Sequence, residues 1–211
     1  MLSDVLSSIK ENKLVAIIRG AEPKSVLKIA RALQAGGIRT LEITLNSPGA
    51  LKVIEEVSSE LGDELLVGAG TVLDPESARM AILAGAQFIL APTVNLKTIE
   101  LTKRYGAVSI PGAFTPTEIL TANEHGADIV KVFPASIGPS YIKDLRGPLP
   151  HIPLLPTGGV TLENVSDFMK AGAVGCGIGS ALVNTKEEVT EAYLSKLTEK
   201  ARDFVNAVSR D

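Results

Sequence analysis

The stretch GADIVKVF, residues 126–133, consists of a glycine followed almost at once by a short apolar run. Comparable pairs of a glycine and an apolar run recur along the chain at intervals of 20 to 26 residues. A repeat of this length indicates one supersecondary unit that is used many times. Glycine suits the position just after a helix, because it tolerates a left-handed backbone there. The repeating glycines are Gly36, Gly62, Gly85, Gly106, Gly126, Gly147 and Gly172.

The apolar runs predict eight buried parallel strands. Each run is continuous rather than alternating, which is typical of a strand covered on both faces. The first run, LVAIIR at residues 14–19, precedes the repeating glycines. The others are RTLEIT (39–44), ELLVGAG (64–70), QFILAP (87–92), AVSIP (107–111), DIVKVF (128–133), IPLLPTG (152–158) and VGCGIG (174–179).

The segments between these runs predict helices. Pro23 occupies a first-turn position, and TPTE at 115–118 has the pattern of a capping box. Thr161 is expected to open a further helix, and residues 187–208 are expected to form the last one.

Eight alternating units predict an α/β fold, a (β/α)₈ TIM barrel with an extra N-terminal helix over roughly residues 2–12. That helix is expected to cover the bottom of the barrel. No Ser/Gly/Pro-rich linker interrupts the series, so residues 1–211 are expected to form a single domain. A doubly wound open sheet is the main alternative, although it would need fewer strands.

Composition restricts the chemistry that the chain can carry out. The net charge of −3 provides no basic footprint for nucleic acid or for a membrane surface. One cysteine and two histidines argue against a disulfide framework and against a metal site. The opening segment lacks the apolar core of a signal peptide, and no apolar run has the roughly 18 residues of a membrane span. We therefore expect a cytoplasmic protein without a metal or other cofactor.

Three predicted strands carry a charged residue in their C-terminal half, namely Arg19, Glu42 and Lys131. The C-terminal ends of barrel strands form the active-site face. An amine in apolar surroundings has a lowered pKa, and a neutral amine can attack a carbonyl to form a Schiff base. Lys131 is therefore a candidate nucleophile. A structural lysine paired with a carboxylate is an equally open interpretation.

Glu42 and Lys131 fall on the second and sixth predicted strands. Strands with even numbers contribute side chains to the same interior layer of a barrel, so these two long side chains are expected to meet near its mouth. A carboxylate beside a lysine nucleophile can transfer protons through water. The alternative interpretation is a simple buried ion pair.

Glycine-rich segments follow the last two predicted strands. PTGGV at 156–160 and GIGSAL at 177–182 occupy the loops where these barrels usually bind phosphate. Glycine lets backbone N–H groups approach an anion closely, and Ser180 can donate a hydroxyl. The glycines could also serve only to make tight turns.

Other residues give weaker signals. Thr71, in GAGTV at the end of the third strand, could bind a substrate oxygen or cap a loop. Pro92 ends the fourth strand, where a rigid turn is expected, and it is a further candidate for contact with substrate. Cys176 is expected to be a small buried residue, while His125 and His151 are expected to lie at the surface or to cap helices.

Taken together, these motifs resemble those of the KDPG/KHG aldolase family. The similarity extends from about residue 5 to residue 208, in the family's order. It is carried by LEITLN, GAGTV, IPGAFTPTE, IVKVFPAS, PTGGV and GIGSAL, of which IVKVFPA and PTGGV are the most specific. The members are class I aldolases that act on 2-keto-3-deoxy-6-phosphogluconate and on 4-hydroxy-2-oxoglutarate.

The resemblance implies a role for each matching residue. Lys131 matches the lysine that forms the Schiff base with pyruvate or the keto substrate, and Glu42 matches the acid/base residue. Thr71 matches the threonine near the pyruvate moiety, and Thr157 the threonine that faces the substrate hydroxyls. The phosphate-binding positions correspond to Gly158, Gly159, Gly179 and Ser180. A homotrimer without a metal cofactor is also implied.

One departure from the family pattern affects the expected substrate. Many gluconate-type members have an arginine that binds the substrate carboxylate where this chain has Asn46, in LNSP. LNSP resembles the phosphogalactonate branch, which has an arginine at the end of the first strand, as Arg19 is here. We hypothesise that Arg19 makes the missing anion contact. Thr157 favours the gluconate epimer, because the galactonate branch tends to have valine there.

Two other classes of function stay open at this stage. A phosphosugar isomerase or epimerase would share the glycine loops but would not need Lys131. A non-catalytic phosphate-binding barrel would keep the glycine spacing but would not need both Lys131 and Glu42. Formation of a covalent adduct at Lys131 separates the aldolase from both.

Overall fold

Strands and helices alternate along the chain in a computed structural model that describes residues 2–209. The strands are β1 Leu14–Ile18, β2 Thr40–Thr44, β3 Leu66–Gly70, β4 Phe88–Leu90, β5 Val108–Ile110, β6 Gly112–Ala113, β7 Val130–Val132, β8 Leu154–Pro156 and β9 Cys176–Ile178. The helices are α1 Leu2–Asn12, α2 Pro23–Ala35, α3 Ala50–Leu61, α4 Pro75–Leu83, α5 Leu96–Arg104, α6 Pro116–Glu124, α7 Pro139–Arg146, α8 Val165–Lys170 and α9 Glu191–Val208.

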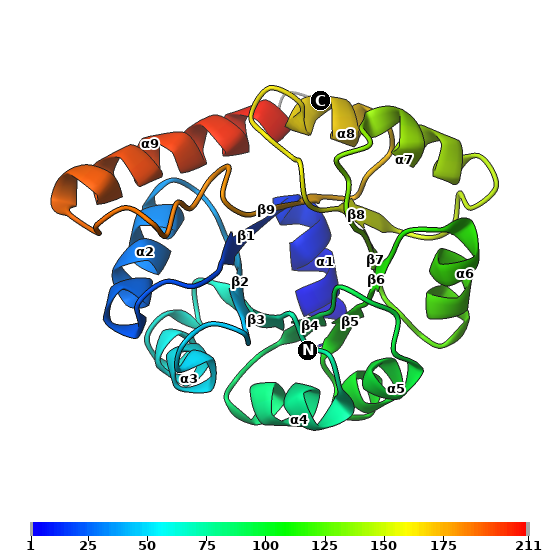
Figure 1. Cartoon of the computed structure of the whole chain (residues 1–211), viewed down its shortest axis with the longest axis horizontal. Helices are drawn as coiled ribbons and strands as arrows, with labels where there is room; N and C mark the ends of the chain where they lie inside the picture. The colour runs from blue at the N-terminus through cyan, green and yellow to red at the C-terminus, as the bar shows by residue number, and fades with distance from the viewer. Residues whose placement is uncertain (1, 210–211) are drawn as a thin grey trace.

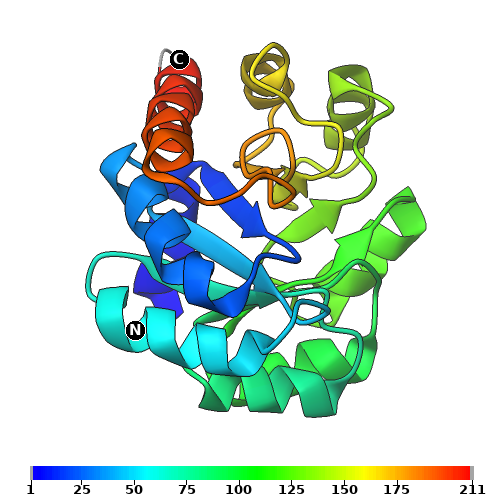
Figure 2. The same ribbon diagram turned by 60° about the vertical axis from the view of Figure 1, so that its left-hand side comes forward.

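All strand pairs are parallel, and the strands form two hydrogen-bonded sets. The first set has the order β5-β4-β3-β2-β1-β9, and the second has the order β6-β7-β8. The sheet curls around a common interior, and helices α2 to α9 lie outside it (Figures 1 and 2). The molecule is therefore an α/β fold with a curled parallel sheet.

Each of the eight predicted strands is found, but the fifth, predicted at 107–111, ends at Ile110, and a further short strand, β6, follows Pro111. Proline has no backbone N–H, so the strand ladder is interrupted at that residue. The Pro111 carbonyl still accepts a hydrogen bond of 2.9 Å from the backbone N–H of Lys131, and the Ser109 carbonyl accepts one of 3.0 Å from Asp128. Strand β5, at the edge of the first set, thus lies beside the residues that lead into β7, while β6 pairs with β7 directly.

The other edges of the two sets also approach each other. Thr157, just after β8, forms a parallel bridge with Gly177 of β9. The backbone N–H of Val174 donates a 3.0 Å hydrogen bond to the carbonyl of Leu154 in β8. Strand β9 pairs on its other side with β1, so the last strand of the chain lies beside the first.

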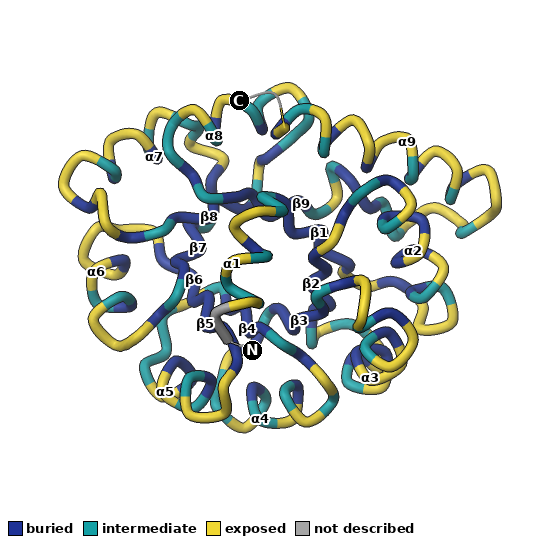
Figure 3. The backbone as a smooth tube through the Cα atoms, turned by 180° about the vertical axis from the view of Figure 1, so that it is seen from behind, coloured by how far each residue is buried: buried dark blue, intermediate teal, exposed yellow. Residues whose placement is uncertain are grey.

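The interior of the curled sheet contains an apolar cluster that α1 covers from one end. Phe88, Val108 and Leu155 are almost completely buried in it, and Ile9 of α1 belongs to the same cluster. In the view from behind, α1 lies in the middle of the ring of buried strands (Figure 3). The ring of Phe88 occupies the place where a side chain on Gly68 would project, so glycine in β3 makes room for the aromatic ring.

Several local predictions are confirmed and others need correction. The capping box at Thr115 and Glu118 is present. The helix expected to open at Thr161 begins instead at Val165, because Asn164 accepts a hydrogen bond from the Thr161 N–H and holds that segment in a turn. The last helix begins at Glu191 rather than at residue 187, because the Thr190 hydroxyl caps it by accepting from the Tyr193 N–H.

The repeating glycines do not all have the predicted left-handed backbone. Gly85, Gly106, Gly126 and Gly172 have positive φ, whereas Gly36, Gly62 and Gly147 are right-handed. At Gly36 the need is for space, because a Cβ there would come within 2.6 Å of the Thr198 carbonyl on α9. Glycine therefore occurs at the same point of the repeat for two reasons. Four positions require a left-handed backbone, and Gly36 requires the absence of a side chain.

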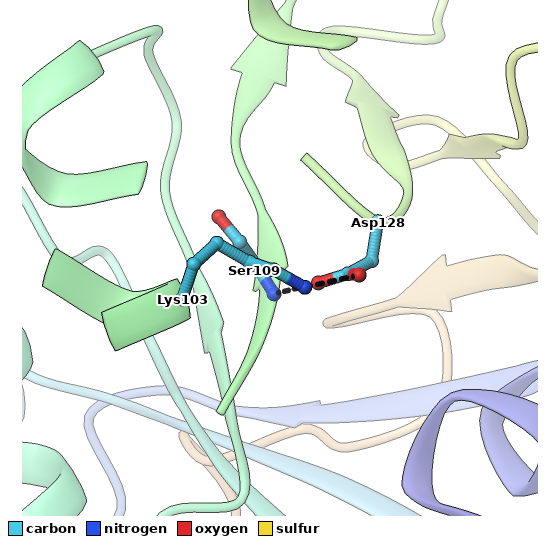
Figure 4. A network of polar contacts seen from close by, with 3 residues as sticks. All are labelled: Lys103, Ser109 and Asp128. Atoms are coloured by element: carbon cyan, nitrogen blue, oxygen red, sulfur yellow. Dashed lines mark hydrogen bonds and ion pairs between the residues drawn. The ribbon is translucent and has the colours of Figure 1, made fainter. Parts of the chain in front are cut away.

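A polar network ties α5, β5 and the start of the β7 segment together. The carboxylate of Asp128 accepts a 2.8 Å hydrogen bond from the Ser109 backbone N–H and a 2.5 Å hydrogen bond from the Lys103 ammonium (Figure 4). Only 12% of the Asp128 side chain is exposed to solvent. Hydrogen bonds to a charged group in such a site contribute more to stability than those on an open surface.

We expect Asp128→Ala to lower the free energy of unfolding by roughly 2 kcal/mol, because it leaves the Ser109 N–H without its partner. Urea denaturation monitored by circular dichroism measures the change. Asp167→Ala is the matched control, since the 63% exposed Asp167 side chain lies 3.9 Å from Lys170. The control should change the free energy by less than about 0.5 kcal/mol. Equal effects of the two substitutions would contradict the role of the Asp128 network.

Candidate active site

Lys131 and Glu42 are charged residues in the middle of buried strands. Lys131 is the central residue of β7, and Glu42 is the central residue of β2. Lys131 is 2% exposed and Glu42 is 0% exposed. Burying a charged group without compensation is costly, so their surroundings decide which protonation states are stable.

The two residues interact electrostatically with each other and with Arg19. Burial lowers the pKa of the Lys131 ammonium, the Glu42 carboxylate opposes that change, and Arg19 lowers the pKa further. Burial raises the pKa of the Glu42 carboxyl, while Lys131 and Arg19 oppose that change. Arg19, Glu42 and Lys131, the three charged residues noted in the predicted strands, are therefore close enough to interact electrostatically.

Glu42 has its carboxyl group in contact with β3. Neither of its carboxyl oxygens has a hydrogen-bond partner among residues 2–209. A Cβ added to Gly70 would overlap Oε1 of Glu42, so the absence of a side chain at Gly70 allows the carboxyl group to lie there. A buried carboxyl with unused hydrogen-bonding capacity is typical of a functional group rather than of a stabilising ion pair.

A cavity of about 640 Å³ opens beside this buried pair. Its wall contains six of the predicted site residues, together with Phe133, over whose ring the Lys131 ammonium lies at 5.0 Å from the centroid. Neither Lys131 nor Glu42 itself lines the cavity, but Ile17, the register partner of Glu42 on β1, does. The predicted residues on the wall are Arg19, Thr157, Gly158, Gly159, Gly179 and Ser180.

The glycines that follow β8 shape one side of this cavity. Gly158 and Gly159 both have φ of +83°, a conformation that residues with side chains rarely adopt. A Cβ on Gly159 would also come within 2.8 Å of the Ser136 Cα. Backbone conformation and close packing therefore both require glycine here, and binding of phosphate by this loop stays a prediction.

Thr71 and Pro92 follow strands β3 and β4 but do not line the cavity. Thr71 has φ of 55°, which is a strained conformation for a β-branched residue. Such strain is often retained at functional sites, and Thr71 follows Gly70, against which Glu42 packs. The backbone of Pro92 lies where a side chain on Gly112 would project. A contact between substrate and either residue stays a prediction.

Sequence reasoning missed the residues that support Arg19. The Thr185 hydroxyl donates a 2.7 Å hydrogen bond to the Arg19 carbonyl, and the Ser47 hydroxyl accepts a 2.8 Å bond from the Gly20 N–H. Asn46 is exposed and does not line the cavity. The LNSP segment therefore supports the Arg19 turn through Ser47. Thr185 and the adjoining Lys186 line the cavity, and their position soon after the last strand was the available signal.

Apart from Arg19 and Lys186, the titratable residues within 2–209 do not line this cavity. Cys176 is buried, and burial raises the pKa of its thiol to about 12, so it is a poor nucleophile. His125 and His151 are exposed, and the ring of His125 is hydrogen-bonded to the Thr121 carbonyl near the end of α6. Across residues 2–209, no three His, Cys, Asp or Glu side chains gather in a way that could hold a metal ion.

None of the helices described for this chain is both long and apolar enough to cross a membrane.

Comparisons with known proteins by family model, by sequence and by structure all find aldolases. The family model for KDPG and KHG aldolase matches residues 5–197. The 2-dehydro-3-deoxy-6-phosphogalactonate aldolase of Escherichia coli K12 is 38% identical, over 92% of this chain and 93% of its own. The 2-dehydro-3-deoxy-phosphogluconate aldolase of Pseudomonas aeruginosa is 36% identical, over 79% of this chain and 76% of its own.

A similar solved structure is that of the KDPG aldolase of Legionella pneumophila with pyruvate captured as a covalent carbinolamine intermediate. It has a TM-score of 0.84 and 28% sequence identity, and the match covers 96% of this chain and 97% of that one.

We expect Glu42→Gln to remove a dependence of stability on pH. The unfolded chain releases this proton near pH 4.5, whereas the folded protein holds it to higher pH, so folding becomes less favourable as the pH rises above 4.5. At pH 8 the variant should therefore be more stable than the original protein, and the difference should diminish toward pH 5. Urea denaturation at both pH values measures it.

The exposed Glu55 of α3 provides the matched control, as Glu55→Gln. A Glu42→Gln variant that is less stable than the original protein at pH 8 would indicate instead that Glu42 is a stabilising partner of Lys131.

Proposed function

The chain belongs to the KDPG and KHG aldolase family, and on this basis we propose that it cleaves 2-keto-3-deoxy-6-phosphogluconate to pyruvate and glyceraldehyde 3-phosphate. It is an aldolase and therefore a carbon–carbon lyase. The observation that carries the proposal is the burial of Lys131 and Glu42 beside a cavity with glycine-rich and cationic walls.

Lys131 is the proposed nucleophile. Burial outweighs the Glu42 charge and lowers the pKa of its amine, which increases the neutral fraction that can attack a carbonyl. The amine forms a bond to the keto carbon, and loss of water gives an iminium ion. The bond between the third and fourth carbons then breaks, and its electron pair passes into the iminium system to give an enamine.

Glu42 is the proposed acid and base. It accepts the proton of the hydroxyl on the fourth carbon, through a water molecule, as that carbon becomes the aldehyde of glyceraldehyde 3-phosphate. The enamine is then protonated at the third carbon. Water hydrolyses the resulting iminium, which releases pyruvate and restores the Lys131 amine.

The cavity walls suit the two anionic ends of this substrate. We assign the carboxylate to Arg19, whose backbone is held by Thr185 and lies beside the Ser47–Gly20 contact. We assign the phosphate to Gly158, Gly159, Gly179 and Ser180, and we expect Thr71, Pro92 and Thr157 to contact the rest of the substrate.

The galactonate epimer is the second candidate substrate. It is favoured by the Escherichia coli phosphogalactonate aldolase, at 38% identity, and by Arg19 on the cavity wall. Thr157 favours the gluconate epimer, which we retain as the main proposal. Cleavage of 4-hydroxy-2-oxoglutarate to pyruvate and glyoxylate would use the same Lys131 and Glu42 chemistry.

We also propose a closed (β/α)₈ barrel in which β5 and β6 are one strand interrupted at Pro111, with α1 as the extra helix and residues 1–211 as one domain. The contacts of β7 with β5 and β6 and the bridge between Thr157 and Gly177 support closure. We also propose a homotrimer, whose interfaces would bury exposed apolar side chains such as Leu73 and Leu83. A cytoplasmic location suits the single buried cysteine.

Borohydride reduction in the presence of pyruvate should attach a reduced pyruvate adduct to Lys131, because borohydride traps the Schiff base. Mass analysis of peptides locates the adduct, and Lys131→Gln should abolish it. An adduct on Lys97 or Lys143 instead would refute the assignment. A phosphosugar isomerase or a non-catalytic barrel would give no pyruvate-dependent adduct at Lys131.

Glu42→Gln should reduce kcat for aldol cleavage by roughly a hundredfold, because the variant has no group to accept the hydroxyl proton. Gly70→Ala should also reduce kcat, since its methyl group displaces the Glu42 carboxyl from its position. A coupled assay of pyruvate release with lactate dehydrogenase measures both, with the exposed Glu55→Gln variant as control. Near-normal turnover of Glu42→Gln would exclude Glu42 as the proton acceptor.

A further inference from the structure

The charged residues on the cavity wall are all positive. Of its sixteen lining residues, Arg19 and Lys186 carry charge, and no carboxylate is among them. The chain as a whole has a net charge of −3, so the cavity differs in sign from the average surface. A concave wall with positive charge concentrates anions.

Lys186 belongs to the segment that connects β9 to α9. In Figure 1 this orange segment runs from β9 toward α2, and its residues line a groove together with the start of α2. Lys186 lines both this groove and the cavity, whose wall also contains Gly158 and Ser180. An exposed ammonium at the cavity edge can reach a ligand without the cost of burying an unpaired charge.

Short-range hydrogen bonds define the conformation of this segment. The Asn184 side chain accepts a 3.2 Å bond from the Lys186 N–H and donates a 2.6 Å bond to the Glu187 carboxylate. Thr185 connects the segment to the Arg19 carbonyl. Glu187 is thus hydrogen-bonded to Asn184, and it lines the groove rather than the cavity.

The phosphate end of the proposed substrate lacks a side-chain cation among the predicted residues. The assigned glycines and Ser180 provide neutral N–H and hydroxyl donors, while a phosphate monoester carries between one and two negative charges near pH 7. Arg19 is assigned to the carboxylate at the other end. Lys186 is the second cation on the same wall, and a compact ammonium is well suited to phosphate.

We propose that Lys186 is a specificity-determining residue that pairs with the substrate phosphate and selects phosphorylated keto acids over unphosphorylated ones. Thr185 acts as a positioning residue, because its hydrogen bond to Arg19 fixes the segment that carries Lys186. This inference rests on the proposed aldolase function and deepens it.

Steady-state cleavage by Lys186→Gln tests the inference. With 2-keto-3-deoxy-6-phosphogluconate we expect KM to rise roughly tenfold with little change in kcat, because a charge-assisted contact to a non-reacting part of the substrate is lost. With 4-hydroxy-2-oxoglutarate, which has no phosphate, KM should stay within about twofold. Lys186→Arg should restore most of the affinity. Lys170→Gln, at an exposed lysine of α8, controls for the change in net charge.

The same variants separate Lys186 from Thr185. Thr185→Val should raise KM for the phosphorylated substrate by a smaller factor than Lys186→Gln. In the double variant, Thr185→Val should add little to the effect of Lys186→Gln, since a positioning residue acts through the group that it positions.

Two results would overturn the inference. One is an equal rise of KM for both substrates, and the other is an unchanged KM for the phosphorylated substrate. Pyruvate trapping at Lys131 in Lys186→Gln distinguishes these results from a failure of the proposed function. A normal adduct in Lys186→Gln together with an unchanged KM refutes only the role of Lys186. Absence of the adduct from the original protein refutes the aldolase mechanism itself.

Discussion

The electrostatic interaction between Lys131 and Glu42 is the constraint on which the site depends. Each residue occupies the centre of a buried strand, where water cannot stabilise its charge. Burial moves the two pKa values toward each other, and the attraction between the ionised forms only partly opposes that movement. Opposite shifts of this kind are typical of a functional pair, whereas a strong ion pair would stabilise both groups in their charged states.

Other parts of the fold leave space around this pair and close one end of the interior. Gly70 leaves room for the Glu42 carboxyl, and Gly68 leaves room for Phe88 deeper in the interior. Helix α1 covers the far end of that interior with Ile9. The cavity lies on the side of Phe133 and Ile17, which adjoin Lys131 and Glu42, and the glycine loops, Arg19 and Lys186 line it.

Much of this arrangement was predictable because it depends on local or periodic features. The glycine repeat and the continuous apolar runs predicted the eight parallel strands, and a charge within such a run made Glu42 and Lys131 candidates that the structure places in buried strands. The interruption at Pro111 was harder to predict, because it depends on which backbone N–H groups the neighbouring strand requires. Ser47 acts through a contact with Gly20 across 27 residues, and Thr185 through a contact with Arg19 across 166 residues, and the sequence has no local signal for either.

The pairing of β9 with β1, reinforced by the hydrogen bond between Thr185 and Arg19, brings the last strand next to the first strand beside the candidate active site. Glu42 and Lys131 come from the first two thirds of the chain, whereas the glycine loops and the segment after β9 come from the last third. The cavity wall is thus assembled from segments that are far apart in the sequence, and contacts of this kind form late in folding because they require long loops to close. A partly folded chain that lacks the pairing of β9 with β1 would contain Lys131 and Glu42 without the glycine-rich wall.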